Sequence, residues 1–138
     1  MSVSGLNHYT IRCTPAELPA LHDFYTRCVQ LEAGARPEMP APGYWLYSDG
    51  KPIVHLYAAL EESAAGPTAA LDHISFRAHS LDATRAHLAS QQVPFDEFPI
   101  PGWPIHQVFL RDPFGLKIEL TFDLDEEEQA GAARVQVG

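Results

Sequence analysis

Two histidines stand at matching places in two similar stretches of the chain. His8 lies in "LNHYTI" and His73 in "LDHISF", and they are 73 − 8 = 65 residues apart in a chain of 138 residues. Each half also ends in a strand-like segment with one more ionisable side chain, His55 in the first and Glu119 in the second, 119 − 55 = 64 residues apart. Three imidazoles and one carboxylate suit Fe, Mn, Co, Ni or Zn. The pattern therefore predicts a site for one divalent metal ion whose identity stays open.

The recurrence of two features at one period indicates a duplicated unit. Each copy is predicted to contain a strand, a helix and then further strands. The predicted strands are 6–12, 44–48, 52–59, 71–77, 93–98, 106–111 and 116–122, and the predicted helices are 18–29 and 81–91. We interpret the whole chain as one domain, with modules at 5–60 and 71–122 and a linker at 61–70. The segment 123–138 begins with a run of acids and is predicted to be a solvated, mobile tail.

The predicted strands each divide into a polar and an apolar face. In the first strand His8 and Arg12 share one face, while Tyr9 and Ile11 lie on the other. The strands that carry the other ionisable residues show the same division, so we expect the helices to cover the apolar faces. A sheet with one solvated face is the simpler alternative, in which the polar residues only meet water. Four matching positions filled by possible ligands favour the metal site.

The composition excludes several classes of protein. Hydrophobic residues make up 46% of the chain and charged residues 20%, which is typical of a globular protein. The formal net charge of −9 argues against a nucleic-acid partner, because such binding depends on clustered Lys and Arg. No apolar run approaches the ~20 residues of a membrane span, and the N-terminal residues lack the features of a signal peptide. Cys13 and Cys28 are expected to be reduced, and we expect a cytoplasmic location.

The chain resembles the vicinal oxygen chelate superfamily, which includes glyoxalase I, extradiol dioxygenases and bleomycin resistance proteins. The resemblance covers 5–122 and rests on "LNHYTIR", "LHDFYTRCVQL", "LDHISF" and "RDPFGLKIEL". It implies an α+β fold of two tandem βαβββ modules, which form paired half-barrels around a polar metal-binding cavity. It implies His8, His73 and Glu119 as metal ligands. His55 stands where glyoxalase I has a fourth ligand, usually Glu or Gln, so it is either a further ligand or an acid–base group.

The resemblance also implies a chemistry, in which the ion binds vicinal oxygens of a small substrate and acts as a Lewis acid. Our first hypothesis is a metal-dependent lyase or isomerase of glyoxalase type that stabilises an enolate-like intermediate, with Glu119 or His55 as the catalytic base. An Fe(II) extradiol dioxygenase that acts on catechols is the second hypothesis. A non-catalytic, drug-binding resistance protein is the third.

Four more residues are candidates for substrate binding. Arg12 follows the first histidine by four residues, as a substrate-binding Arg does in glyoxalase I, although an exposed rim charge is the alternative. Tyr57 shares a face with His55, and a core or interface position is equally compatible with the pattern. Trp103 and His106 belong to the Pro-rich stretch "FPIPGWPIHQ", which could form a lid over the cavity. A histidine without a function beside a loop is the alternative for His106. The resemblance favours a homodimer with sites shared between chains, although closure of both modules within one chain stays open.

Overall fold

The chain forms two compact units, Met1–Gly66 and Pro67–Gly138, in a computed structural model that describes residues 1, 5–67 and 70–137. The boundary between the units lies within the predicted linker. None of the helices in the described ranges has both the length and the apolar character that crossing a bilayer requires.

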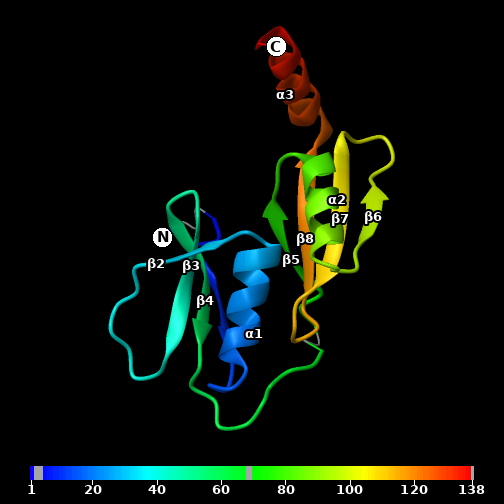
Figure 1. Cartoon of the computed structure of the whole chain (residues 1–138). Coiled ribbons are helices and arrows are strands. Elements are labelled where there is room, and N and C mark those ends of the chain that lie inside the picture. The colour runs from blue at the N-terminus through cyan, green and yellow to red at the C-terminus, as the bar shows by residue number, and fades with distance from the viewer. Residues whose placement is uncertain (2–4, 68–69, 138) are drawn as a thin grey trace. The chain divides into compact units, whose positions relative to one another are not determined.

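The first unit is a four-stranded sheet with one helical segment (Figure 1). Its elements are β1 (Tyr9–Arg12), α1 (Leu18–Asp23), the π-helical segment η1 (Phe24–Cys28), β2 (Glu32–Gly34), β3 (Gly43–Ser48) and β4 (Lys51–Tyr57). The order across the sheet is β1-β4-β3-β2, so the first strand lies beside the last. The β1 and β4 strands run parallel, whereas the other neighbours are antiparallel.

The sequence predicts one continuous helix over 18–29, but its hydrogen bonding changes near Phe24. The Val29 N–H donates to Phe24 O at 3.2 Å, five residues back, which is a π-helical bond. The Thr26 hydroxyl donates to His22 O at 2.7 Å, which is the carbonyl that the Thr26 N–H would use in an α-helix. A threonine that bonds back in this way disturbs the regular helix, which accounts for the change.

The second unit repeats the plan of the first (Figure 1). Its elements are β5 (His73–Arg77), α2 (Leu81–Ser90), β6 (Asp96–Pro99), β7 (Ile105–Arg111), β8 (Lys117–Asp123) and α3 (Leu124–Val137). The order is β5-β8-β7-β6, with β5 parallel to β8 and the other pairs antiparallel. The predicted α+β fold of two βαβββ modules is therefore confirmed. The short β2 strand was not among the predicted strands.

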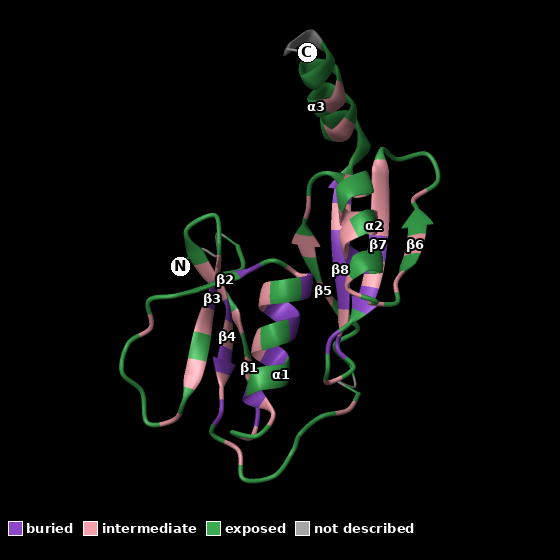
Figure 2. Ribbon diagram, in the orientation of Figure 1, coloured by how far each residue is buried: buried purple, intermediate pink, exposed green. Residues whose placement is uncertain are grey.

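The cores of both units lie between the sheet and its helix, as the alternation of apolar residues predicts (Figure 2). Buried side chains of the first unit are Leu18, Leu21, Phe24, Tyr25, Leu46, Val54 and Leu56. Those of the second are Leu88, Val108, Leu110, Ile118, Leu120 and Phe122. Because side chains of a strand alternate, His55 points to the face opposite Val54 and Leu56. Glu119 lies opposite its own buried neighbours in the same way.

The turn before β8 is held by one buried carboxylate. Asp112 is 5% exposed, and its Oδ1 accepts hydrogen bonds from the N–H groups of Phe114 and Leu116, both at 2.9 Å. Gly115 adopts a φ of +83°, which a residue with a Cβ rarely tolerates. These contacts fix where β8 begins and therefore where Glu119 lies along it.

The C-terminal segment, which the sequence predicts to be a solvated, mobile tail, forms the helix α3 directly after β8 (Figure 1). Asp123 Oδ1 accepts the N–H groups of Asp125 at 2.9 Å and Glu126 at 3.2 Å, so it caps the helix. Glu127 accepts the N–H groups of Ser80, at 2.9 Å, and Leu81 at the start of α2. Asp123 and Glu127 thus lie at the N-termini of two helices, where a negative charge is stabilising.

Candidate functional site

The polar face of the second sheet holds a histidine and a carboxylate side by side. His73 Nε2 and Glu119 Oε1 are 3.5 Å apart. They lie on β5 and β8, which pair in parallel with Ser75 opposite Glu119. Glu119 is only 5% exposed, and a carboxylate is rarely buried without partners.

Three neutral donors satisfy the Glu119 carboxylate. Ser75 Oγ donates to Oε2 at 2.8 Å, Gln107 Nε2 donates to Oε1 at 2.9 Å, and the Thr121 hydroxyl donates to Oε2. The donors come from β5, β7 and β8. Hydrogen bonds to an ionised acceptor are strong, so three strands fix the position of this side chain.

His73 has a second partner at its other ring nitrogen. Its Nδ1 lies 2.7 Å from Asp72 Oδ2, and the same oxygen lies 3.0 Å from Lys117 Nζ. The pKa of the Asp72 carboxyl lies below its ordinary value. The main cause is the hydrogen bond with His73, and the interaction with Lys117 is the second. The Phe109 ring meets the imidazole edge to face at a centroid distance of 5.9 Å. The imidazole of His73 is therefore held from several sides.

The polar face of the first sheet carries a stack of three rings. Trp45 and His55 have centroids 4.2 Å apart with planes 10° apart, and His55 and His8 have centroids 3.9 Å apart with planes 13° apart. His8 Nδ1 also lies 2.7 Å from Asn7 Oδ1. The two histidines predicted for the first unit are thus brought together in direct contact.

The stack limits what His55 can bind. The lone pair of an imidazole nitrogen lies in the ring plane, and the planes of His8 and His55 are nearly parallel at a centroid distance of 3.9 Å. One ion about 2.1 Å from a nitrogen of each ring cannot lie in both planes. His55 Nε2 also donates to Pro52 O at 3.1 Å. The pKa of His55 is lowered, chiefly by burial and secondly by the nearby His8, so the ring is neutral. Because Nε2 carries the proton that Pro52 O accepts, the lone pair is at Nδ1.

The strand registers make the two polar faces equivalent. Thr10 lies opposite His55 in the first sheet, and Ser75 lies opposite Glu119 in the second. The β3 and β7 strands each place an aromatic side chain opposite that same position. One equivalent position therefore carries an imidazole in the first unit and a carboxylate in the second.

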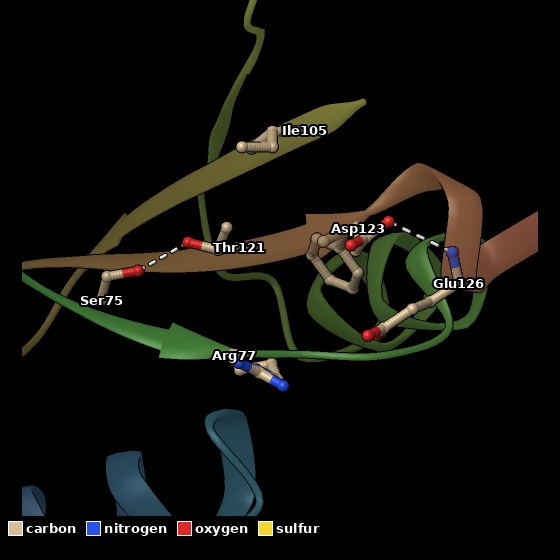
Figure 3. A pocket seen from close by; sticks show the side chains of 7 residues that line it. Ser75, Arg77, Ile105, Thr121, Asp123 and Glu126 are labelled. Carbon is tan, nitrogen blue, oxygen red and sulfur yellow. Dashed lines mark hydrogen bonds between the residues drawn. The ribbon is translucent and has the colours of Figure 1, made fainter. Parts of the chain in front are cut away.

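A cavity of about 340 Å³ opens in the second unit beside the hydroxyl partners of Glu119 (Figure 3). The Ser75 and Thr121 hydroxyls lie 2.6 Å apart and face each other. Within the described ranges the Arg77 guanidinium forms no ion pair. The cavity is lined by Ser75, Arg77, Ile105, Thr121, Phe122, Asp123 and Glu126.

The four residues predicted to bind substrate lie in different places. Arg12 and Tyr57 are paired across β1 and β4, on the polar face of the first unit. Trp103 is 67% exposed in the turn between β6 and β7. His106 shares a face of β7 with the buried residues, and its Nε2 lies 3.0 Å from Glu97 Oε1. The structure therefore keeps His106 away from the polar face that carries Glu119.

Sequence reasoning missed the residues that hold the candidate ligands. Gln107 alternates with buried Val108, so its place on the polar face was readable from the pattern. Asn7 and Asp72 stand directly before the two repeated histidines, and both have side-chain oxygens that accept hydrogen bonds. The occurrence of Asn or Asp directly before both histidines was the signal from which these partners could have been predicted.

Each unit supplies a pair of possible ligands. In the residues that the structure describes, no three His, Cys, Asp or Glu side chains gather where one ion could be held. In the first unit the two candidates are His8 and His55, whose stacked rings cannot bind one ion together, and in the second they are His73 and Glu119. Within the described residues, neither unit by itself brings three such ligands together.

Comparisons with known proteins identify the family of this fold. The family model described as Glyoxalase/Bleomycin resistance protein/Dioxygenase superfamily matches residues 5–120. No curated protein matches the chain.

Three solved structures illustrate the likeness. A glyoxalase family protein from Bacillus anthracis has 18% identity and a TM-score of 0.71, over 89% of this chain and 98% of that one. Lactoylglutathione lyase from Agrobacterium tumefaciens has 18% identity and a TM-score of 0.64, over 88% and 96%. The antibiotic binding protein TnmS3 from Streptomyces sp. CB03234 has 22% identity and a TM-score of 0.66, over 89% and 98%. At these identities the likeness shows the fold alone.

Proposed function

The chain belongs to the Glyoxalase/Bleomycin resistance protein/Dioxygenase superfamily, and from this membership we propose that it is a metal-dependent enzyme of glyoxalase type. The reaction class is that of a lyase or isomerase, and the substrate is a small molecule with vicinal oxygens. Enzymes and binding proteins both occur among the proteins that share its fold. Fold alone therefore does not distinguish an enzyme from a binding protein, and the proposal of an enzyme rests on the residues of the polar faces.

The contact between His73 and Glu119 is the observation that supports a metal site best. A separation of 3.5 Å between Nε2 and Oε1 is one that two ligand atoms, each about 2.1 Å from a single ion, can have. His8 occupies the equivalent place in the first unit. We assign His8, His73 and Glu119 as the ligands of one divalent ion, since two imidazoles and a carboxylate suit Fe, Mn, Co, Ni or Zn.

When bound, such an ion would act as a Lewis acid on the substrate oxygens. Glu119 is held by three hydrogen bonds, so its role is to stay in place rather than to move a proton. His55 is the better candidate for proton transfer, because it is a neutral imidazole with a lone pair at Nδ1. The Arg12 and Arg77 guanidiniums stand on the two polar faces and can orient an anionic group of the substrate.

Analysis of the purified protein tests this function. Protein prepared without added metal should contain one divalent ion per site. It should convert the hemithioacetal of glutathione and a 2-oxoaldehyde without consuming oxygen. Stoichiometric metal with no conversion of any such adduct would contradict a glyoxalase reaction on glutathione adducts.

The stacking of His55 on His8, with its Nε2 hydrogen-bonded to Pro52 O, favours a second function. If His55 does not bind the ion, the ligands are two histidines and one glutamate, which is the set of non-haem Fe(II) oxygenases. Iron in the purified protein together with oxygen uptake on catechols would identify an extradiol-type dioxygenase. Tight binding of a drug-like ligand by protein without metal or turnover would instead identify a binding protein.

We predict that His55→Ala leaves metal content unchanged and lowers turnover about 10²–10⁴-fold, the usual contribution of a general base. The reason is that His55 lies in the stack without a free coordination direction toward the ion of His8. Metal content by elemental analysis and kcat of the identified reaction are the two measurements.

His55→Phe is the matched control, because phenylalanine keeps a ring beside Trp45 and His8 but has no nitrogen. It should lose turnover to the same degree as His55→Ala. Loss of the metal from both variants would contradict the assignment and make His55 a ligand.

A further inference from the structure

Both candidate histidine ligands have the same kind of hydrogen bond at Nδ1. His8 Nδ1 lies 2.7 Å from Asn7 Oδ1, and His73 Nδ1 lies 2.7 Å from Asp72 Oδ2. Each acceptor belongs to the residue directly before its histidine. The same contact at the same place in both units makes a chance surface contact a poor explanation.

These acceptors decide which nitrogen carries the proton. An ionised carboxylate and an amide oxygen accept hydrogen bonds but donate none, so Nδ1 must carry the hydrogen. Nε2 then has its lone pair free to bind a metal ion. In the second unit Nε2 is indeed the nitrogen that lies 3.5 Å from Glu119 Oε1. The tautomer and the ring orientation thus agree with the ligand role.

We propose that Asn7 and Asp72 are positioning residues, which set the tautomer and the ring orientation of His8 and His73 for binding a divalent ion. This inference rests on the proposed metal site. Partners of this kind, at the second nitrogen of a metal-binding histidine, typically change metal affinity by about 10- to 100-fold.

The two positioning residues differ in charge, which predicts unequal effects. Asp72 carries a negative charge, whereas Asn7 is a neutral amide. A carboxylate at Nδ1 makes the imidazole a more basic ligand than an amide does. Lys117 Nζ, 3.0 Å from Asp72 Oδ2, holds that carboxylate beside the ring. His73 should therefore be the stronger of the two histidine ligands.

Cobalt binding tests the inference without any need for a substrate. Co²⁺ affinity is measured by competition with a chelator, and the ligand field is read from the visible absorption of the bound ion. Asp72→Ala should weaken binding by about 10- to 100-fold and change the spectrum, and Asn7→Ala should have the smaller effect of the two. Asp72→Asn keeps an acceptor and should recover most of the loss.

Asp82→Ala is the matched control, because Asp82 is another exposed carboxylate that pairs with a cation, Arg85, at 2.8 Å. It removes the same charge and should leave Co²⁺ affinity unchanged. If the unaltered chain binds no Co²⁺, the metal site fails and this inference fails with it. If the unaltered chain binds Co²⁺ and Asp72→Ala binds it equally well with an unchanged spectrum, only the positioning role is overturned.

Discussion

Replacement of His73 by alanine is expected to abolish stoichiometric binding of a divalent ion. The change removes one of three ligands, so the loss should exceed the roughly 10- to 100-fold that a residue behind a ligand contributes. The fold should survive, because the His73 side chain is 37% exposed and the core lies on the other face of the sheet. Elemental analysis and a titration with Co²⁺ measure the loss, and thermal unfolding of the metal-free proteins checks the fold.

His106→Ala is the control for this experiment. His106 is also a histidine of the second sheet, but it contacts Glu97 on the face that packs against α2. It should retain the metal in full. Stoichiometric metal in the His73→Ala variant would show that the ion is held elsewhere.

The fold could be predicted to a large extent because its signals are local and repeated. The alternation around His55 and Glu119 places apolar neighbours on one face, and burial of Val54 and Ile118 agrees with it. The repetition of the first and last strands of each unit predicted the duplication. In both units of the structure the first strand pairs in parallel with the last, β1 with β4 and β5 with β8.

The parts of the fold that could not be predicted depend on contacts between distant residues. The run of acids after β8 gives no sign that Glu127 accepts a hydrogen bond from the N-terminus of α2, which is 46 residues away along the chain. The change from α1 to η1 involves the hydrogen bond from the Thr26 hydroxyl to His22 O, which the pattern of apolar residues does not predict. Patterns of residue type do not reveal such hydrogen bonds.

The candidate site shows the same division. Strand alternation could place His8, His73 and Glu119 on polar faces, but it treated His55 and Glu119 as equal. The structure gives them different surroundings, since Glu119 accepts three hydrogen bonds while His55 stacks between two rings. His106 falls on the same alternation as buried Val108 and Leu110, so its place on the apolar face of β7 was also readable in the sequence.

The asymmetry between the units has a functional consequence. The first unit supplies imidazoles alone, and the second supplies the only carboxylate among the candidate ligands. Two copies of either unit would hold a poorer set for a divalent ion than one of each, because two histidines and one glutamate together leave positions open for substrate. We therefore expect the proposed site to combine a first unit with a second unit. Whether these come from one chain or from two can be decided by mixing two inactive variants.

We expect His8→Ala and His73→Ala chains, each unable to hold the ion, to recover metal binding when they are unfolded and refolded together. If the proposed homodimer shares its sites, a mixed dimer pairs the intact His8 of one chain with the intact His73 and Glu119 of the other. Its second site lacks both histidines, so random pairing in equal amounts restores about one quarter of the normal metal content. Each variant refolded alone is the control and should stay empty. Differently tagged chains show whether mixed dimers have formed. If they have formed and the mixture still binds no metal, each site is built within one chain, because exchange of partners then cannot bring the two intact halves together.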